Sequence, residues 1–130
     1  MVTQPYVEKA IQYSNNSALG PDGVPYLAWR KAGRLAVVII HNALSQLQSD
    51  TFSVEHLPRD FNTGFLCCLP KKPSGYDPAL GDPYAPNATR PLSLVNTDNR
   101  LMASAARIRV EPTMESVISD MQRGSSEAGK

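Results

Sequence analysis

Two stretches near the start of the chain repeat apolar residues at helical spacing. Residues 5–14 predict a short helix, because the apolar positions fall on one face and Pro5 suits a first helical turn. Residues 25–31 predict a second short helix that begins at Pro25. The positions that share a face are Val7, Ala10, Ile11 and Ser14 in the first helix and Tyr26 and Trp29 in the second. We expect Tyr26 and Trp29 to be core residues rather than platforms for stacked bases.

Residues 35–48 form the longest periodic stretch and predict a third helix. The run at residues 37–40 is β-branched and alone would suit a strand, but the length of the periodic stretch favours a helix. A further helix is predicted over residues 97–110, capped by Asn96 or Thr97, and a last short helix over 113–119. The predicted inward faces are Leu35, Val38, Ile39, Ala43 and Leu47 in one helix and Leu101, Ala105 and Ile108 in the other.

Two short apolar runs in the second half of the chain predict strands. Residues 64–70 end at a proline and are expected to form a buried strand, and residues 90–95 a second strand that is interrupted near Pro91. A long loop joins them, and Pro58 is expected to begin one helical turn at residues 57–61. The pattern therefore predicts an α+β fold, with a helix-rich N-terminal part and a short β-hairpin.

The tetrapeptide Gly-Pro-Asp-Gly at residues 20–23 is a strong turn signal. Proline presets one backbone dihedral, and glycine tolerates a positive φ. We expect Asp22 to serve this turn by bonding its own backbone rather than a metal ion.

Composition narrows the class of protein without naming a function. The 130 residues suit one small domain or part of a larger one, and 42% hydrophobic residues allow a core. The two cysteines, Cys67 and Cys68, are adjacent, so neither a disulfide framework nor a zinc spacing is present. No signal pattern and no membrane span is seen. We therefore expect an intracellular protein of the nucleus or cytoplasm, neither secreted nor in a membrane.

Charge is distributed unevenly, although the net charge is only +1. Residues 71–109 contain six basic and three acidic residues, a local excess that suits phosphate binding. Lys71 ends one predicted strand and Arg90 begins the next, so the two cations could meet across the hairpin. The alternatives are a solvated loop start for Lys71 and Lys72, and for Arg90 a salt bridge to Asp82 or Asp98. Arg100, Arg107 and Arg109 form either an ordinary charged helix face or a face toward nucleic acid.

Several segments match one family in the same order. They are residues 17–25 around the Gly-Pro-Asp-Gly turn, Leu57-Pro58 with Phe61, residues 69–72 (Leu-Pro-Lys-Lys), residues 90–98 (Arg-Pro-Leu-Ser-Leu-Val-Asn-Thr-Asp), Arg107 with Glu111-Pro112, and residues 122–124 (Gln-Arg-Gly). Each motif alone is common, but their order and spacing over residues 10–124 resemble the reverse transcriptases of non-LTR (LINE-like) retrotransposons. Phe61 stands where that family usually has tryptophan.

The resemblance implies an incomplete part of a right-hand polymerase. Residues 1–124 would hold the fingers and the start of the palm, and residues 125–130, which do not match, would be a disordered tail. Lys71 and Arg90 would contact the nucleotide triphosphate. Lys72, Arg100 and Arg107 would contact nucleic acid, so the implied partners are an RNA or DNA template and deoxynucleotides.

The same resemblance implies that the catalytic carboxylates of the polymerase are not among these residues. Polymerases clamp two metal ions with carboxylates, and none of the seven aspartates lies in an apolar strand beside another carboxylate. We expect no catalytic residue, metal site or cofactor in this chain, with Mg²⁺ needed only by the full-length parent enzyme. An RNA-directed DNA polymerase fragment that is inactive alone is the first hypothesis. A non-catalytic nucleic-acid-binding module is the second, and a helical interaction domain with chance motif matches is the third.

Overall fold

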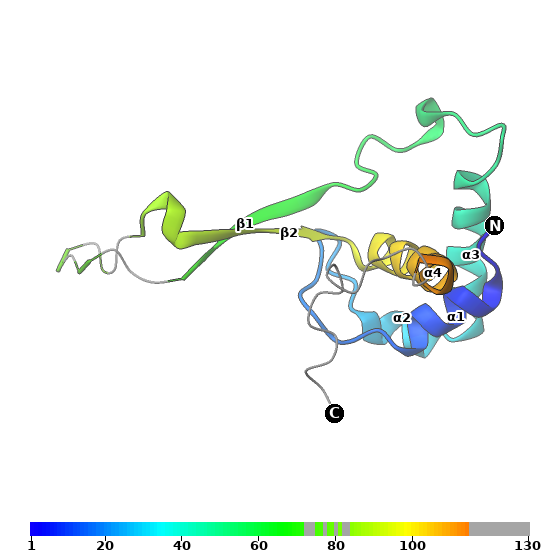
Figure 1. Ribbon diagram of the computed structural model, residues 1–130, viewed down its shortest axis with the longest axis horizontal. Coiled ribbons are helices and arrows are strands. Elements are labelled where there is room, and N and C mark those ends of the chain that lie inside the picture. The colour runs from blue at the N-terminus through cyan, green and yellow to red at the C-terminus, as the bar shows by residue number, and fades with distance from the viewer. Residues whose placement is uncertain (72–74, 77, 80, 82–83, 115–130) are drawn as a thin grey trace.

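The computed structural model describes residues 1–71, 75–76, 78–79, 81 and 84–114, apart from the side chain of His56. Figure 1 shows two parts, a body of helices and a long β-hairpin that extends away from it. The elements are α1 (Gln4–Gln12), α2 (Tyr26–Ala32), α3 (Arg34–Leu47), a 3-10 turn (Val54–His56), β1 (Gly64–Pro70), a second 3-10 turn (Pro86–Ala88), β2 (Thr89–Val95) and α4 (Thr97–Met114). The mixed α+β class predicted from the pattern is confirmed.

The core lies between the helices of the body. Helix α1 packs mainly on α4 and also on α3. Val7 of α1 and Leu101 of α4 are fully buried and lie near the centre of the core. The other buried apolar residues are Val2, Ala10, Ile11, Tyr26, Ala36, Ile40, Leu44, Met102 and Ala105. The predicted inward positions of the first helix are confirmed at Val7, Ala10 and Ile11, and Tyr26 is confirmed as a core residue. No helix of the described part is long and apolar enough to cross a membrane.

The third helix is confirmed, and two residues of its predicted inward face, Ala43 and Leu47, are partly buried against the core. The N-terminal part of that predicted face is wrong. Leu35 and Ile39 are 63% and 49% exposed, whereas the buried face consists of Ala36, Ile40 and Leu44. These residues are spaced four apart and therefore form one stripe along the helix.

Strands β1 and β2 form a two-stranded antiparallel sheet in which Gly64 pairs with Val95 and Pro70 with Thr89. The predicted interruption near Pro91 is wrong, because β2 runs through it. Lys71 N–H donates to Ala88 O at 2.8 Å, so by alternation Pro91 and its partner Cys68 form a non-hydrogen-bonded pair. The missing N–H of the proline then faces the free edge, where proline is tolerated.

The prediction of a buried strand at residues 64–70 is correct in its bounds and wrong in its burial. Within β1 only Cys67 is partly buried, and Phe65 and Leu66 are 56% and 73% exposed. The hairpin projects from the body, so no described helix covers either of its faces (Figure 1).

Two local predictions are also corrected. Residues 58–61 form a hydrogen-bonded turn rather than a helical turn, with Phe61 N–H donating to Pro58 O at 3.0 Å, and a 3-10 turn precedes it. Helix α4 does not stop at Val110 but continues through Pro112 to Met114. The rest of the predicted short helix at 113–119 and the tail at 125–130 lie outside the described residues.

Candidate nucleotide and nucleic-acid interface

Lys71 and Arg90 lie on the same face of the hairpin. Arg90 is paired with Leu69, and side chains alternate along a strand, so Lys71 shares the face of Leu69 and Arg90. The hydrogen bond from Lys71 N–H to Ala88 O extends the ladder by one residue and makes Lys71 the diagonal neighbour of Arg90. Diagonal neighbours in antiparallel sheets are typically about 7–8 Å apart. Folding therefore brings together two cations that are 19 residues apart in the sequence.

The two cations border an open hollow of about 710 Å³, which Leu69, Pro70, Asn87 and Ala88 complete. Both side chains are exposed, and neither β1 nor β2 contains an acidic residue. In the described part of the chain neither cation forms an ion pair, so the salt bridge to Asp98 that sequence left open for Arg90 is not formed. Asp82, the other alternative partner, lies outside the described residues. The hollow is thus a site of positive charge open to solvent.

An apolar stripe leads along the same face to the two cations. The register places five apolar side chains on it, namely Phe65, Cys67, Leu69, Leu92 and Leu94. Phe65, Leu69 and Leu92 are large and exposed, while Leu94 and Cys67 are partly buried. A face that ends in two cations and also carries an exposed aromatic ring combines the two features that bind single-stranded nucleic acid, phosphate attraction and base stacking.

Of the other predicted nucleic-acid contacts, Arg100 and Arg107 lie on α4. Lys72 lies outside the described residues. Arg100 is partly buried, donates to Ala18 O at 2.7 Å and places its guanidinium 5.7 Å from the ring centre of Tyr26. Arg107 is exposed and bridges Glu111 one turn later on α4 at 3.1 Å. Arg100 is thus held within the protein, and Arg107 belongs to a solvated helix face.

Sequence reasoning missed a junction at the base of the hairpin, defined here as residues 18–24 with residues 96–100. Asn96 Oδ1 accepts the backbone N–H of Asp22 at 3.1 Å. The Thr97 hydroxyl, on a fully buried residue, donates to Val24 O and accepts the indole N–H of Trp29, both at 2.8 Å. The turn itself forms as predicted, because Asp22 Oδ1 accepts Val24 N–H at 3.1 Å. Two motifs that are 74 residues apart thus meet in direct contact.

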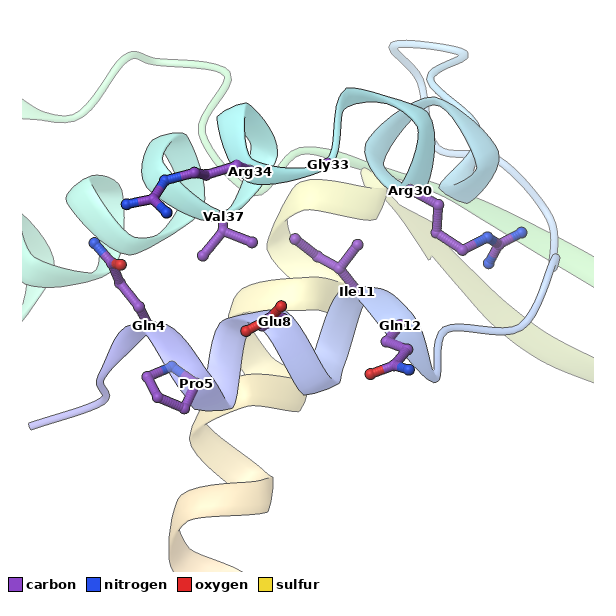
Figure 2. A pocket seen from close by; sticks show the side chains of 9 residues that line it. All are labelled: Gln4, Pro5, Glu8, Ile11, Gln12, Arg30, Gly33, Arg34 and Val37. Atoms are coloured by element: carbon purple, nitrogen blue, oxygen red, sulfur yellow. The ribbon is translucent and has the colours of Figure 1, made fainter.

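A second hollow of about 680 Å³ lies between α1, the end of α2 and the start of α3. Figure 2 shows Ile11 and Val37 pointing toward each other across it, with Gln4, Glu8, Arg34, Gln12 and Arg30 around them. Arg30 is already bound, since its guanidinium donates to Ser14 and to Asn16 Oδ1. The remaining charges, Glu8 and Arg34, are of opposite sign, so this hollow does not concentrate one charge as the hairpin does.

Among the described residues, no three His, Cys, Asp or Glu side chains gather so that they could hold a metal ion. The adjacent cysteines are free thiols, and the alternation of β1 turns Cys67 and Cys68 to opposite faces. His41 Nδ1, on α3, is buried without a hydrogen-bond partner in this part of the chain.

Comparison with known proteins gives no family assignment: no protein-family model, no curated protein and no solved structure matches this chain.

Proposed function

We propose that this chain is the fingers part of an RNA-directed DNA polymerase of the non-LTR retrotransposon type, and that its hairpin binds nucleotide and nucleic-acid phosphates. The observation that carries the proposal is that Lys71 and Arg90 share one exposed face and border one hollow, beside strands that contain no acidic residue. The ordered motifs supply the family. The hairpin supplies the chemistry, because a point charge beside a forked guanidinium suits phosphate oxygens.

The apolar stripe supports a nucleic acid rather than a small anion as the larger ligand. Inorganic anions need only the cations, whereas the exposed ring of Phe65 and the aliphatic side chains of Leu69 and Leu92 offer contact area to bases. In the proposed arrangement, phosphates lie at the distal end of the face and bases lie toward the body.

Binding of a labelled single-stranded RNA or DNA at several salt concentrations tests this proposal. We expect affinity to fall with salt, and the double substitution Lys71→Ala with Arg90→Ala to lower the slope of log K against log salt by about 0.7 for each phosphate that is no longer neutralised. The matched control is Lys9→Ala with Arg59→Ala, which removes the same charges from exposed positions on α1 and in the turn at 58–61. Unchanged binding in the hairpin variant, or an equal loss in the control, would refute the proposal.

The proposal assigns binding and not polymerisation to this chain. Lys71 and Arg90 can neutralise phosphate charge. Polymerase chemistry also needs carboxylates that hold the catalytic metal ions, and β1 and β2 contain no Asp or Glu. Primer extension with Mg²⁺ or Mn²⁺ is therefore expected to give no product above background. Templated incorporation by the purified chain would overturn this assignment.

A further inference from the structure

The hairpin is attached to the helical body through very few groups. Each strand packs on the other, and neither packs broadly on a described helix. Figure 1 shows the strands leaving the body together and extending away from it. Both connections lie at the base of the hairpin. The chain enters β1 after the turn at 58–61, and a single residue, Asn96, separates Val95 of β2 from Thr97 of α4. The direction of the hairpin therefore depends on how this one residue is held.

Asn96 is held from two sides. Its backbone C=O accepts Arg100 N–H at 3.3 Å, which ties it to the first turn of α4. Its side-chain Oδ1 accepts Asp22 N–H at 3.1 Å, which ties it to the Gly-Pro-Asp-Gly turn. Gly20 of that turn is buried and packs on it so closely that a Cβ at residue 20 would lie 2.5 Å from the backbone N of Asn96.

We propose that Asn96 is a positioning residue that sets the angle between the hairpin and the helical body, and so the place where Lys71 and Arg90 meet their ligand. The part of this inference that concerns ligand rests on the proposed function, while the part that concerns the angle does not. The Gly-Pro-Asp-Gly turn holds Asn96 in place through the hydrogen bond from Asp22 and the close packing of Gly20.

Leverage makes this contact consequential. Arg90 stands six positions before Asn96, and a strand rises about 3.3 Å per residue, so Arg90 lies roughly 20 Å along the strand from Asn96. A rotation of about 10° at Asn96 would move Arg90 by roughly 3.5 Å, which exceeds the length of a hydrogen bond. The hydrogen bond between Asp22 N–H and Asn96 Oδ1 can therefore determine whether Lys71 and Arg90 reach a ligand bound at the distal end of the hairpin.

The contact lies outside the buried core. The bond between Asp22 N–H and Asn96 is exposed, whereas the core below it is closed by buried residues such as Leu101 and Thr97. Asn96→Ser removes the reach to Asp22 but keeps a residue that favours helix starts. Asn96→Asp keeps both the reach and the acceptor oxygen, so it is the matched rescue.

The test measures a distance that changes with this angle. Nitroxide labels are attached to the native Cys68 on β1 and to Gln12→Cys on α1, both at exposed positions, in a chain with Cys67→Ser, and the distance distribution between them is recorded by pulsed dipolar spectroscopy. We expect one narrow distribution for the parent and for Asn96→Asp, and at least a twofold broader one for Asn96→Ser. Asn42→Ala, on the exposed side of α3, is the control and should leave the width unchanged.

Binding of a labelled single-stranded RNA in the same variants gives the second readout. Asn96→Ser should weaken it several-fold and Asn96→Asp should restore it, although neither residue carries a cation. A narrow distribution in folded Asn96→Ser would overturn the positioning role, whatever the binding result. A broad distribution in a protein that binds no nucleic acid would uphold that role and refute the proposed function. If Asn96→Ser does not fold, Asn96 is a folding residue and the positioning role is rejected.

Discussion

The indole N–H of Trp29 donates a 2.8 Å hydrogen bond to the hydroxyl of Thr97, a residue 68 positions later in the chain. The same hydroxyl donates to Val24 O at 2.8 Å, so one buried oxygen joins α2, the segment after the turn and the start of α4. Two of the motifs that carry the family resemblance, residues 17–25 and 90–98, are therefore in direct contact. Their order in the sequence corresponds to one structural unit at the base of the hairpin.

Replacing Thr97 by valine should destabilise the protein by about 1–3 kcal/mol. Valine fills the same volume but leaves both the Trp29 N–H and Val24 O without partners in a buried place. Urea unfolding measures the loss, and because Trp29 is the only tryptophan its fluorescence also reports the changed environment of the indole. Thr63→Val, at an exposed position, is the control. An unfolding midpoint equal to that of the control would contradict the role of the hydroxyl.

Replacing Gly20 by alanine should cost about 1–3 kcal/mol, because the added methyl group meets the backbone of Asn96 and not a flexible side chain. The comparison is Gly75→Ala, where a Cβ has open space and the backbone needs no positive φ. Thermal unfolding of the two variants should show a lower midpoint for Gly20→Ala alone. Equal midpoints would show that the turn can move away from Asn96 without loss.

Two of the three arginines of α4, Arg100 and Arg107, should differ sharply in their effect on stability. Arg100→Gln loses a bond to Ala18 O and the contact with the Tyr26 ring, and should cost about 1–2 kcal/mol. Arg107→Gln breaks an ion pair whose side chains are 67% and 48% exposed, and should change the free energy of unfolding by less than about 0.5 kcal/mol. Chemical denaturation of both variants checks the ranking, which a larger loss for Arg107→Gln would reverse.

The helices and strands of this fold could be predicted from sequence more readily than which of their faces are buried. Periodicity located the four α-helices of the described residues, because the helical repeat is a local property. It misplaced the N-terminal part of the inward face of α3, because residues 35–40 are all apolar and two overlapping stripes fit such a run. Only the packing of α1 and α4 on Ala36, Ile40 and Leu44 decides between them.

The hairpin shows the same limit at a larger scale. An apolar run such as residues 64–70 has the same pattern whether the strand is covered or lies in a two-stranded ribbon, so its bounds were predictable and its exposure was not. The meeting of Lys71 and Arg90 was predictable, since a hairpin joins the end of one strand to the start of the next. The contact between Asn96 and Asp22 was not, because no local pattern pairs a turn with a distant helix start.

Because the hairpin is exposed, we expect it to tolerate polar substitutions at apolar positions that the sequence pattern alone would assign to a core. Leu66→Lys should change the free energy of unfolding by less than about 0.5 kcal/mol and reduce self-association, because Leu66 is 73% exposed on a strand with a free edge. Leu101→Ala, in the fully buried centre of the body, should instead cost about 2–5 kcal/mol. Light scattering and urea unfolding separate the two effects, and unfolding by Leu66→Lys would show that the hairpin face is covered in solution.

The two adjacent cysteines offer a probe of which hairpin face binds nucleic acid. Cys67 shares its face with Lys71 and Arg90, whereas Cys68, which is exposed, points to the opposite face. The single-thiol variants Cys68→Ser and Cys67→Ser should therefore react with a maleimide at different rates in the free protein, with Cys68 the faster because it is the more accessible. A saturating single-stranded oligonucleotide should slow the reaction of Cys67 several-fold and that of Cys68 much less. Equal protection of both thiols would mean that the ligand surrounds the hairpin, and protection of Cys68 alone would place it on the face that lacks the two cations.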